Sequence, residues 1–132
     1  MEIGVEAILR LLLAAFLGAV IGYQRERAGK EAGLRTHILI STGAALFTVA
    51  SIYGFAGSDP SRIAAGIVTG IGFLGAGAII RSTEGGIVGL TTATTIWVSA
   101  CIGMAAGAGM YILAPVATLV VLIVLLLPRR AG

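Results

Sequence analysis

The sequence has few charged and few aromatic side chains. Of its 132 residues 11% are charged and 6% are aromatic, while 58% are hydrophobic. Soluble domains carry about 25% charged residues, so this chain lacks the polar side chains that would cover a water-facing surface. A lipid-facing surface does not need them. We therefore expect a membrane protein with an all-α, polytopic fold, and no nucleic-acid partner.

Cysteine and histidine each occur once, which limits the chemistry that the chain can perform. Cys101 lies in an apolar run, so the chain has no internal disulfide framework. With one His and no acidic residue deep inside an apolar stretch, the sequence offers no recognisable nucleophile and base pair, and it indicates no cofactor. An enzyme acting on lipid or cell-wall substrates is the least supported hypothesis, and we expect a non-enzymatic protein.

Long apolar runs are what the sequence has instead. A membrane-crossing helix needs about 20 largely apolar residues. The chain offers five such stretches, at residues 5–23, 37–56, 63–80, 88–107 and 109–127. The last two form one charge-free run that is too long for a single crossing, and Gly107-Ala108-Gly109 supplies a tight reversal. The sequence predicts a compact bundle of five transmembrane helices as a single domain, 1–132, without a soluble C-terminal domain.

The basic residues beside these spans predict the orientation of the chain. Two of them, Arg10 and Arg62, fall on one side. Seven fall on the other: Arg25, Arg27, Lys30, Arg35, Arg81, Arg129 and Arg130. Because Lys and Arg concentrate in cytoplasmic loops, we expect the N-terminus outside, and the C-terminus and segment 24–36 in the cytoplasm.

Glycine is abundant, and one glycine cluster has the spacing of a dinucleotide-binding motif. Gly70, Gly72 and Gly75 follow the pattern G-x-G-x-x-G, but no carboxylate for a ribose stands about 20 residues on. Small residues instead let membrane helices approach closely. We expect the glycines to pack helices, with span three clasped by neighbours on both sides, and one stripe to serve a homodimer. The packing candidates are Gly18, Gly22, Gly66, Gly70, Gly72, Gly75, Gly77, Gly103 and Gly107.

Segment 24–36 is the densest polar stretch, and two interpretations of it stay open. It is either a topology anchor that contacts membrane lipids, or a docking surface for a partner or a phosphate. Thr36 is placed to cap span two, and His37 to lie at the interface as a structural or lipid-facing residue. The candidate residues of this loop are Arg25, Glu26, Lys30, Arg35, Thr36, His37 and, from the next cytoplasmic loop, Arg81.

On the outer side, Asp59-Pro60-Ser61-Arg62 is typical of a helix start. Asp59 is expected to cap the helix, with ion pairing or cation binding as the alternative, and it is the one weak candidate for a metal ligand. Glu6 and Arg10 stand four apart in span one and are expected to pair. An Arg at that depth can also extend outward to the interface.

Span four carries several hydroxyl groups. Thr91, Thr95 and Ser99 share one side of the helix, with Thr92 beside them. Such hydroxyls usually bond their own preceding turn or a neighbouring helix, and lining a polar path is the alternative. Trp97 lies in the middle of the span, so we expect it to pack between helices.

A route for a divalent cation meets a physical obstacle in this sequence. Mg²⁺ favours carboxylate oxygens, and an ionisable group usually stands inside a transporter's bundle. The carboxylates lie near or outside the predicted span ends: Glu2, Glu6, Glu26, Glu31, Asp59 and Glu84.

Three blocks taken together resemble the MgtC/SapB family of bacterial inner-membrane proteins. They are GYQRERAGKEAGLRTHILISTGAALF (22–47), DPSRIAAGIVTGIGFLGAGAIIR (59–81) and GLTTATTIWVSACIGMAAGAG (89–109). The match runs in order through most of the chain, and AGLRTH with GIGFLGAGAIIR is its most specific part. The resemblance implies the family's five-helix domain in the bacterial inner membrane.

The resemblance also implies a function. Family members are linked to growth under magnesium limitation, to virulence through survival in host phagocytes, and to restraint of the proton-driven ATP synthase. We expect helix–helix contact with such a membrane partner. The alternative is a transporter or channel for Mg²⁺ or another small solute, with Asp59 and Arg62 as its outer mouth. The family's characteristic polar positions match Arg25, Glu26, Lys30, Arg35, Thr36, His37, Asp59, Arg62, Arg81, Thr91 and Thr92.

Overall fold

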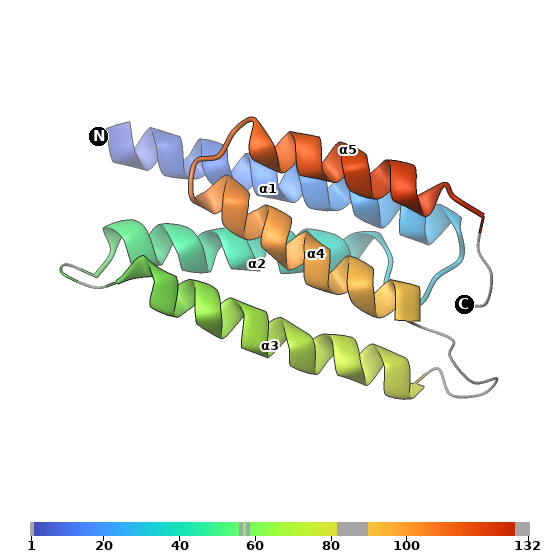
Figure 1. The fold of residues 1–132 in the computed structure, drawn as a ribbon. Coiled ribbons are helices and arrows are strands. Elements are labelled where there is room, and N and C mark those ends of the chain that lie inside the picture. Colours follow the sequence, from blue (N-terminus) through green and yellow to red (C-terminus); the bar gives the residue numbers. More distant parts are fainter. Residues whose placement is uncertain (1, 56, 58, 82–89, 129–132) are drawn as a thin grey trace.

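The chain folds into helices that run up and down through one bundle. The computed structural model describes residues 2–55, 57, 59–81 and 90–128. Within these residues it contains α-helices and no strand, as expected from the apolar runs. Successive helices run in opposite directions (Figure 1). They are α1 (Glu2–Arg27), α2 (Leu34–Tyr53), α3 (Pro60–Arg81), α4 (Leu90–Gly107) and α5 (Leu113–Leu125).

Four of these helices, α1 to α4, are long and apolar enough to cross a membrane. The fifth, α5, has 13 residues, and at 1.5 Å per residue it extends only about 20 Å. The hydrocarbon core of a bilayer is about 30 Å thick. The structure thus supports a multi-pass membrane protein, while the fifth crossing and the orientation stay predictions.

The core lies where α1, α2 and α4 meet. One cluster of buried side chains joins these helices to the start of α5, and consists of Ala14, Leu17, Ile21, Ala45, Ile102, Ala106 and Ala114. A second cluster attaches α3 through Ile71, which packs with Ala44, Ile96 and Ala100. Alanines dominate both clusters, so these helices approach closely with little side-chain bulk between them.

Glycines bring the backbones of α1 and α4 against α2. A Cβ atom at Gly18 would lie 2.7 Å from the carbonyl oxygen of His37, and one at Gly107 would lie 2.7 Å from that of Ala45. At Gly103 an added Cβ would overlap the carbonyl of Ser41, and at Gly22 it would lie 2.8 Å from Leu34 Cα. Any side chain at these positions would force the helices apart.

The glycines of α3 behave differently, and the expected clasp from both sides is wrong. No described atom lies within 4 Å of a Cβ built at Gly66, Gly70, Gly72 or Gly77, whereas Gly75 reaches Ala93 at 3.6 Å. Among the residues of α3 whose burial is described, only Ile71 and Gly75 are buried. The helix packs against α2 and α4 along one edge and leaves its other faces open.

The connector between α1 and α2 is shorter than the expected loop 24–36. The first helix continues to Arg27 and the second begins at Leu34, so six residues, 28–33, join them. Gly29 ends α1 in the left-handed region, with φ 74°. The Lys30 N–H donates to the Arg25 carbonyl at 3.0 Å, and the Gly29 N–H donates to that of Glu26 at 3.0 Å. These two bonds form a Schellman-type helix end.

Thr36 does not cap α2, which corrects a further expectation. The helix starts two residues before it, after Gly33, and Thr36 is exposed. The free Leu34 N–H instead donates to Oε1 of Glu26 at 2.9 Å. The cap therefore comes from the end of α1, since the tight connector brings that carboxylate to the first turn of α2.

At the opposite end of the bundle, Asp59 caps α3 as expected. Its Oδ1 accepts the Ser61 N–H at 3.0 Å and the Ser61 hydroxyl at 2.8 Å. Both bonds hold the pKa of the Asp59 carboxyl below its ordinary value, and the bond from the Ser61 hydroxyl has the larger effect. Because this pKa is lowered, the ionised carboxylate contributes its full stabilisation at every pH above the ordinary pKa of an Asp. That contribution is lost as the pH falls through the lowered pKa.

The structure contains the chain reversal that the sequence predicts at Gly107-Ala108-Gly109. Gly109 has φ 86°, the Gly109 N–H donates to the Ala106 carbonyl, and the Met110 N–H donates to that of Ala105, both at 3.0 Å. The turn carries the chain from α4 to α5, where Pro115 lies in the first turn. Trp97 is 46% exposed, so its expected packing between helices is wrong.

Candidate functional site

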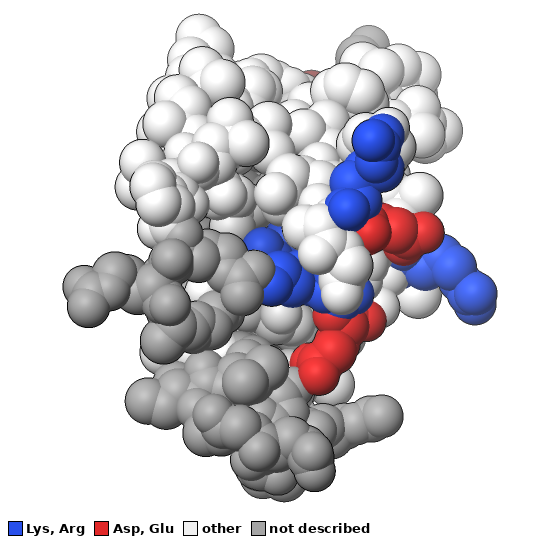
Figure 2. All heavy atoms as spheres, turned by 90° about the vertical axis from the view of Figure 1, so that its right-hand side faces the viewer, with Lys and Arg blue, Asp and Glu red and all other residues white. Residues whose placement is uncertain are grey.

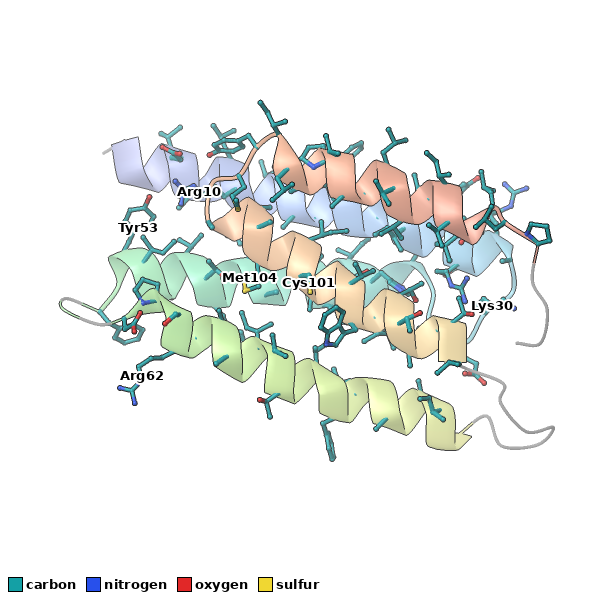
Figure 3. The ribbon with its side chains drawn as sticks, in the orientation of Figure 1. Arg10, Lys30, Tyr53, Arg62, Cys101 and Met104 are labelled. Atoms are coloured by element: carbon teal, nitrogen blue, oxygen red, sulfur yellow. The ribbon has the colours of Figure 1, made fainter. Side chains whose placement is uncertain are left out.

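Charged residues gather at the two ends of the bundle. The end that contains the α1–α2 connector, called here the connector end, carries a patch of mixed sign (Figure 2). Its described members are Arg25, Glu26, Arg27, Lys30, Glu31 and Arg35. Arg10 and Arg62 lie at the opposite end (Figure 3). The long middle of the bundle is apolar apart from hydroxyl groups.

A buried polar cluster lies just inside the connector end. It consists of Arg25, His37, Thr92 and Thr95, contributed by α1, α2 and α4, and each of the four is at most 3% exposed. Nη2 of Arg25 donates to the hydroxyl oxygen of Thr92 at 3.2 Å. The cluster thus links all three central helices through polar contacts.

His37 is at the centre of this cluster, so of the two expected roles the structural one is confirmed and the lipid-facing one is wrong. Its ring is 0% exposed, and Nδ1 lies 2.9 Å from the Gly33 carbonyl oxygen. A carbonyl only accepts, so Nδ1 carries a proton. Nε2 lies 3.1 Å from Thr95 Oγ1. A neutral ring accepts the Thr95 hydroxyl proton at Nε2, whereas a charged ring donates there.

The hydroxyl groups of α4 point mostly into the bundle. Thr92, Thr95 and Ser99 are buried, while Thr91 is partly exposed. Thr95 Oγ1 also lies 2.9 Å from the Thr92 carbonyl oxygen, in its own preceding turn as the sequence predicts, and its single hydroxyl proton is donated either there or to Nε2 of His37. Ser99 Oγ is buried and finds no hydrogen-bond partner among the described residues.

A second polar cluster stands at the opposite end, around Arg10. The expected pair with Glu6 is present at 2.9 Å. Nη1 also donates to the Gly107 carbonyl at 3.0 Å, and Nε to the Tyr111 hydroxyl at 3.4 Å. The guanidinium carbon lies 5.3 Å from the centre of the Tyr53 ring. Arg10 is 7% exposed, so these partners enclose its guanidinium at this end of the bundle.

Sequence reasoning missed most of this second cluster. Tyr53 ends α2, Gly107 ends α4 and Tyr111 lies between α4 and α5, and no local sequence pattern links them to Arg10. The only available signal was an unusually deep Arg in an apolar helix, because such a residue needs several acceptors.

The remaining predicted site residues stay apart from both clusters. Arg35 and Thr36 are exposed and Lys30 is partly exposed. Arg81 ends α3, and its side chain lies outside the described residues, as do Glu84, Arg129 and Arg130. The two residues of the proposed outer mouth, Asp59 and Arg62, are both exposed. Across the described part of the chain, no group of three or more His, Cys, Asp or Glu could hold a metal ion.

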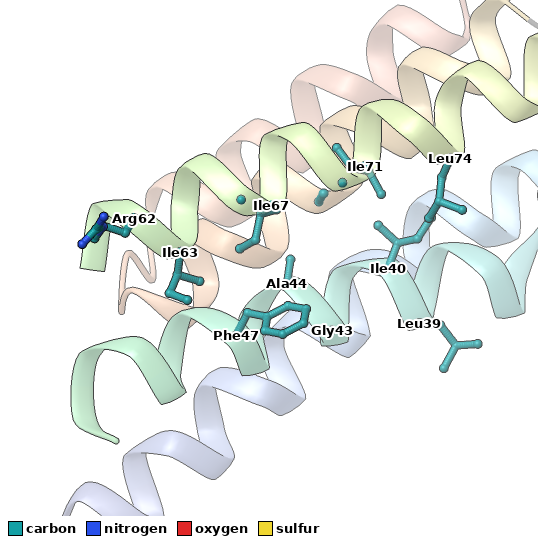
Figure 4. A pocket seen from close by; sticks show the side chains of 13 residues that line it. Leu39, Ile40, Gly43, Ala44, Phe47, Arg62, Ile63, Ile67, Ile71 and Leu74 are labelled. Carbon is teal, nitrogen blue, oxygen red and sulfur yellow. The ribbon is translucent and has the colours of Figure 1, made fainter. Parts of the chain in front are cut away.

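An apolar groove separates α2 from α3 (Figure 4). It encloses about 580 Å³, and Arg62 stands at one end of it. The apolar residues along it are Leu39, Ile40, Gly43, Ala44, Phe47, Ile63, Gly66, Ile67, Gly70, Ile71, Leu74 and Ala100. No sequence pattern indicated this groove, since neighbouring helices were expected to pack against Gly66 and Gly70.

Comparison with known proteins places this arrangement in a family. The model of the MgtC family matches residues 11–132. The chain is 53% identical over 128 residues to "Putative magnesium transporter YhiD" of Escherichia coli K12, covering 91% of this chain and 59% of that protein. It is 50% identical over 126 residues to "Protein MgtC" of Salmonella typhimurium LT2, covering 95% of this chain and 53% of that protein.

A cyanobacterial relative, the uncharacterized protein slr0014 of Synechocystis, is 44% identical over 119 residues, which cover 89% of this chain and 50% of that protein. The chain thus spans between a half and three fifths of the length of these relatives. No solved structure matches it. With the family model covering nearly the whole sequence, the chain belongs to the MgtC family.

Proposed function

We propose that this chain is a non-enzymatic protein of the bacterial inner membrane that serves adaptation to low magnesium by binding another membrane protein through α3. The link to magnesium is supported by the name of one relative, "Putative magnesium transporter YhiD", and by membership of the MgtC family. The observation that carries the contact mechanism is the open outer surface of α3, which buries fewer residues than the other long helices.

That outer surface is lined by small residues. Ala65, Thr69, Gly72 and Ala76 are all exposed, and at 3.6 residues per turn they fall within about 60° of one another. We call them the small face of α3. Lipid tails are as apolar as leucine, so membrane helices associate by close packing, and small residues permit it. A partner helix can therefore approach α3 along this face.

The partner is a membrane protein such as the proton-driven ATP synthase, which the family resemblance suggests. Exposed Arg35 and Thr36, beside the α1–α2 connector, supply a second, cytoplasmic contact. In a pathogen the same restraint of ATP synthesis would serve survival inside phagocytes. A second copy of this chain is the competing occupant of the small face.

Co-purification from native membranes of cells grown at low magnesium tests this proposal. The tagged wild-type protein is expected to recover the ATP synthase. Gly72→Leu, which places bulk on the small face, is expected to lower the recovery at least tenfold. Gly70→Leu is the matched control, because Gly70 faces the groove and an added Cβ has equal space there.

The outcome is decided by the difference between these two variants. Recovery of no membrane protein, or equal loss with both leucines, contradicts the proposal. Two differently tagged copies expressed together identify the homodimer, since one copy would then recover the other and Gly72→Leu would separate them.

A magnesium transporter is the second candidate, and the name of one relative favours it. Against a route through the central helices stand two buried guanidiniums, Arg10 and Arg25, because like charges repel strongly where little water screens them. Purified protein in liposomes is expected to pass no Mg²⁺. Flux that Asp59→Asn abolishes would reverse the order of the two candidates.

A further inference from the structure

The groove between α2 and α3 has a length and a chemistry that neither of the two candidate functions uses. It follows α3 from Arg62 to Leu74 (Figure 4), a distance of about 18 Å at 1.5 Å per residue. One leaflet of a bilayer contributes half of the roughly 30 Å hydrocarbon core. The groove therefore matches one leaflet in depth, whereas a partner helix would cross both.

The groove is apolar everywhere except at one end. Apart from Arg62, each of its lining residues is aliphatic, aromatic or glycine. Gly43, Gly66 and Gly70 open its walls, since no described atom lies within 4 Å of a Cβ built on any of them. A slender apolar chain fits such a channel without displacing either helix.

Arg62 stands where the groove meets the end of the bundle. Its side chain is exposed and makes no hydrogen bond or ion pair with another described residue. The nearby Asp59 directs its Oδ1 to Ser61. A guanidinium binds a phosphate through paired N–H donors, and phosphates are the groups found at this depth of a membrane.

From these observations we infer that the groove is a binding site for one phospholipid of the surrounding bilayer. One acyl chain lies along α3 between the two helices, and the lipid phosphate meets the guanidinium of Arg62. The small face used in the proposed function points elsewhere, because Gly70 and Gly72 are separated by about 160° around the helix. A result that contradicts the lipid site therefore leaves the proposed contact through the small face untouched, and the reverse also holds.

Photocrosslinking tests the acyl chain. The purified protein is placed in nanodiscs that contain phosphatidylglycerol with a diazirine in the middle of one acyl chain, and the adducts are mapped by mass spectrometry. The wild type is expected to concentrate adducts on Phe47 and Ile67. Gly70→Leu, and Gly66→Leu as a second filling variant, are expected to reduce these adducts at least fivefold. Gly72→Leu is the control that should leave them unchanged.

Native mass spectrometry from detergent tests the phosphate contact with the same lipid. Arg62→Gln is expected to lower the retained phosphatidylglycerol at least fivefold, while Arg62→Lys keeps part of it. Adducts spread evenly over the helices, or unchanged by both filling variants, would mean ordinary boundary lipid and overturn the inference. Crosslinks from one copy of the chain into the groove of another would overturn it as well, by showing a protein occupant.

Discussion

At the scale of single residues, two buried arginines hold the ends of the bundle. Arg10 and Arg25 lie on one face of α1, about 22 Å apart along its axis, and both are less than a tenth exposed. A charge in hydrocarbon costs at least about 2.5 kcal/mol. Arg10 meets Glu6 and the Gly107 carbonyl, and Arg25 meets Thr92. Such contacts offset the cost and tie α1 to α4 at both ends.

The first residue-scale prediction concerns His37. His37→Phe keeps the ring volume but removes the bonds to the Gly33 carbonyl and to Thr95. The Gly33 carbonyl keeps the backbone N–H of residue 37 as a partner, and the Thr95 hydroxyl keeps the Thr92 carbonyl. The variant therefore loses two hydrogen bonds worth about 0.5–1.5 kcal/mol each, and it is expected to unfold at a lower temperature in detergent. Thr36→Val is the control, since the adjacent Thr36 is exposed. Equal melting temperatures for His37→Phe and the wild type would show that the hydrogen bonds of His37 do not stabilise the fold.

Gly109 supports a second prediction at this scale. Gly109→Ala places a Cβ in the left-handed region, which costs about 1–2 kcal/mol, and sets it 2.8 Å from Nη2 of Arg10. Gly29→Ala has the same unfavourable backbone conformation but no steric contact, because nothing lies within 4 Å of its added Cβ. Thermal unfolding in detergent is expected to rank Gly109→Ala as the less stable variant. The reverse order would show that Arg10 is not fixed where the structure places it.

At the scale of the helices, the sequence could predict those features that depend on residues close together in the chain. The turn at Gly109 after α4 and the start of α3 after Asp59 follow from turn and cap residues that are close together in the chain. The exposure of Trp97 and the open space at Gly66 do not follow from residues close by in the chain. In lipid the outer faces are as apolar as the core, so no alternation of polar and apolar residues reveals which face is buried.

The close approach of α4 to α2 gives an element-scale prediction. Gly103→Ala would push a methyl group into the carbonyl of Ser41, so it is expected to separate the two helices and to lower the yield of folded protein severely. Gly72→Ala, in the open on α3, is expected to be neutral or to stabilise by up to about 1 kcal/mol, since Ala is the better helix former. Size-exclusion chromatography and melting in detergent measure both. Tolerance of Gly103→Ala would contradict the packing of α2 on α4.

At the scale of the whole molecule, the two ends differ in charge. Described basic residues outnumber acidic ones at the connector end, with Arg25, Arg27, Lys30 and Arg35 against Glu26 and Glu31. Of the described basic residues, only Arg10 and Arg62 lie at the other end, where Glu6 and Asp59 offset them. Because membrane proteins keep Lys and Arg in the cytoplasm, the connector end is expected to face inward. Two positions then report on the topology: Arg35 at the connector end and Arg62 at the other.

Cysteine labelling tests this orientation together with the fifth crossing. The single native thiol is first removed by Cys101→Ser, and Arg35→Cys, Arg62→Cys and Leu126→Cys are made one at a time. A membrane-impermeant maleimide added to intact spheroplasts is expected to label only Arg62→Cys. Leu126 follows α5 and is 77% exposed, so its cysteine is labelled from inside if α5 crosses the bilayer. Labelling of that cysteine from outside would leave α5 as a short helix in the outer leaflet, and the bundle would have four crossings.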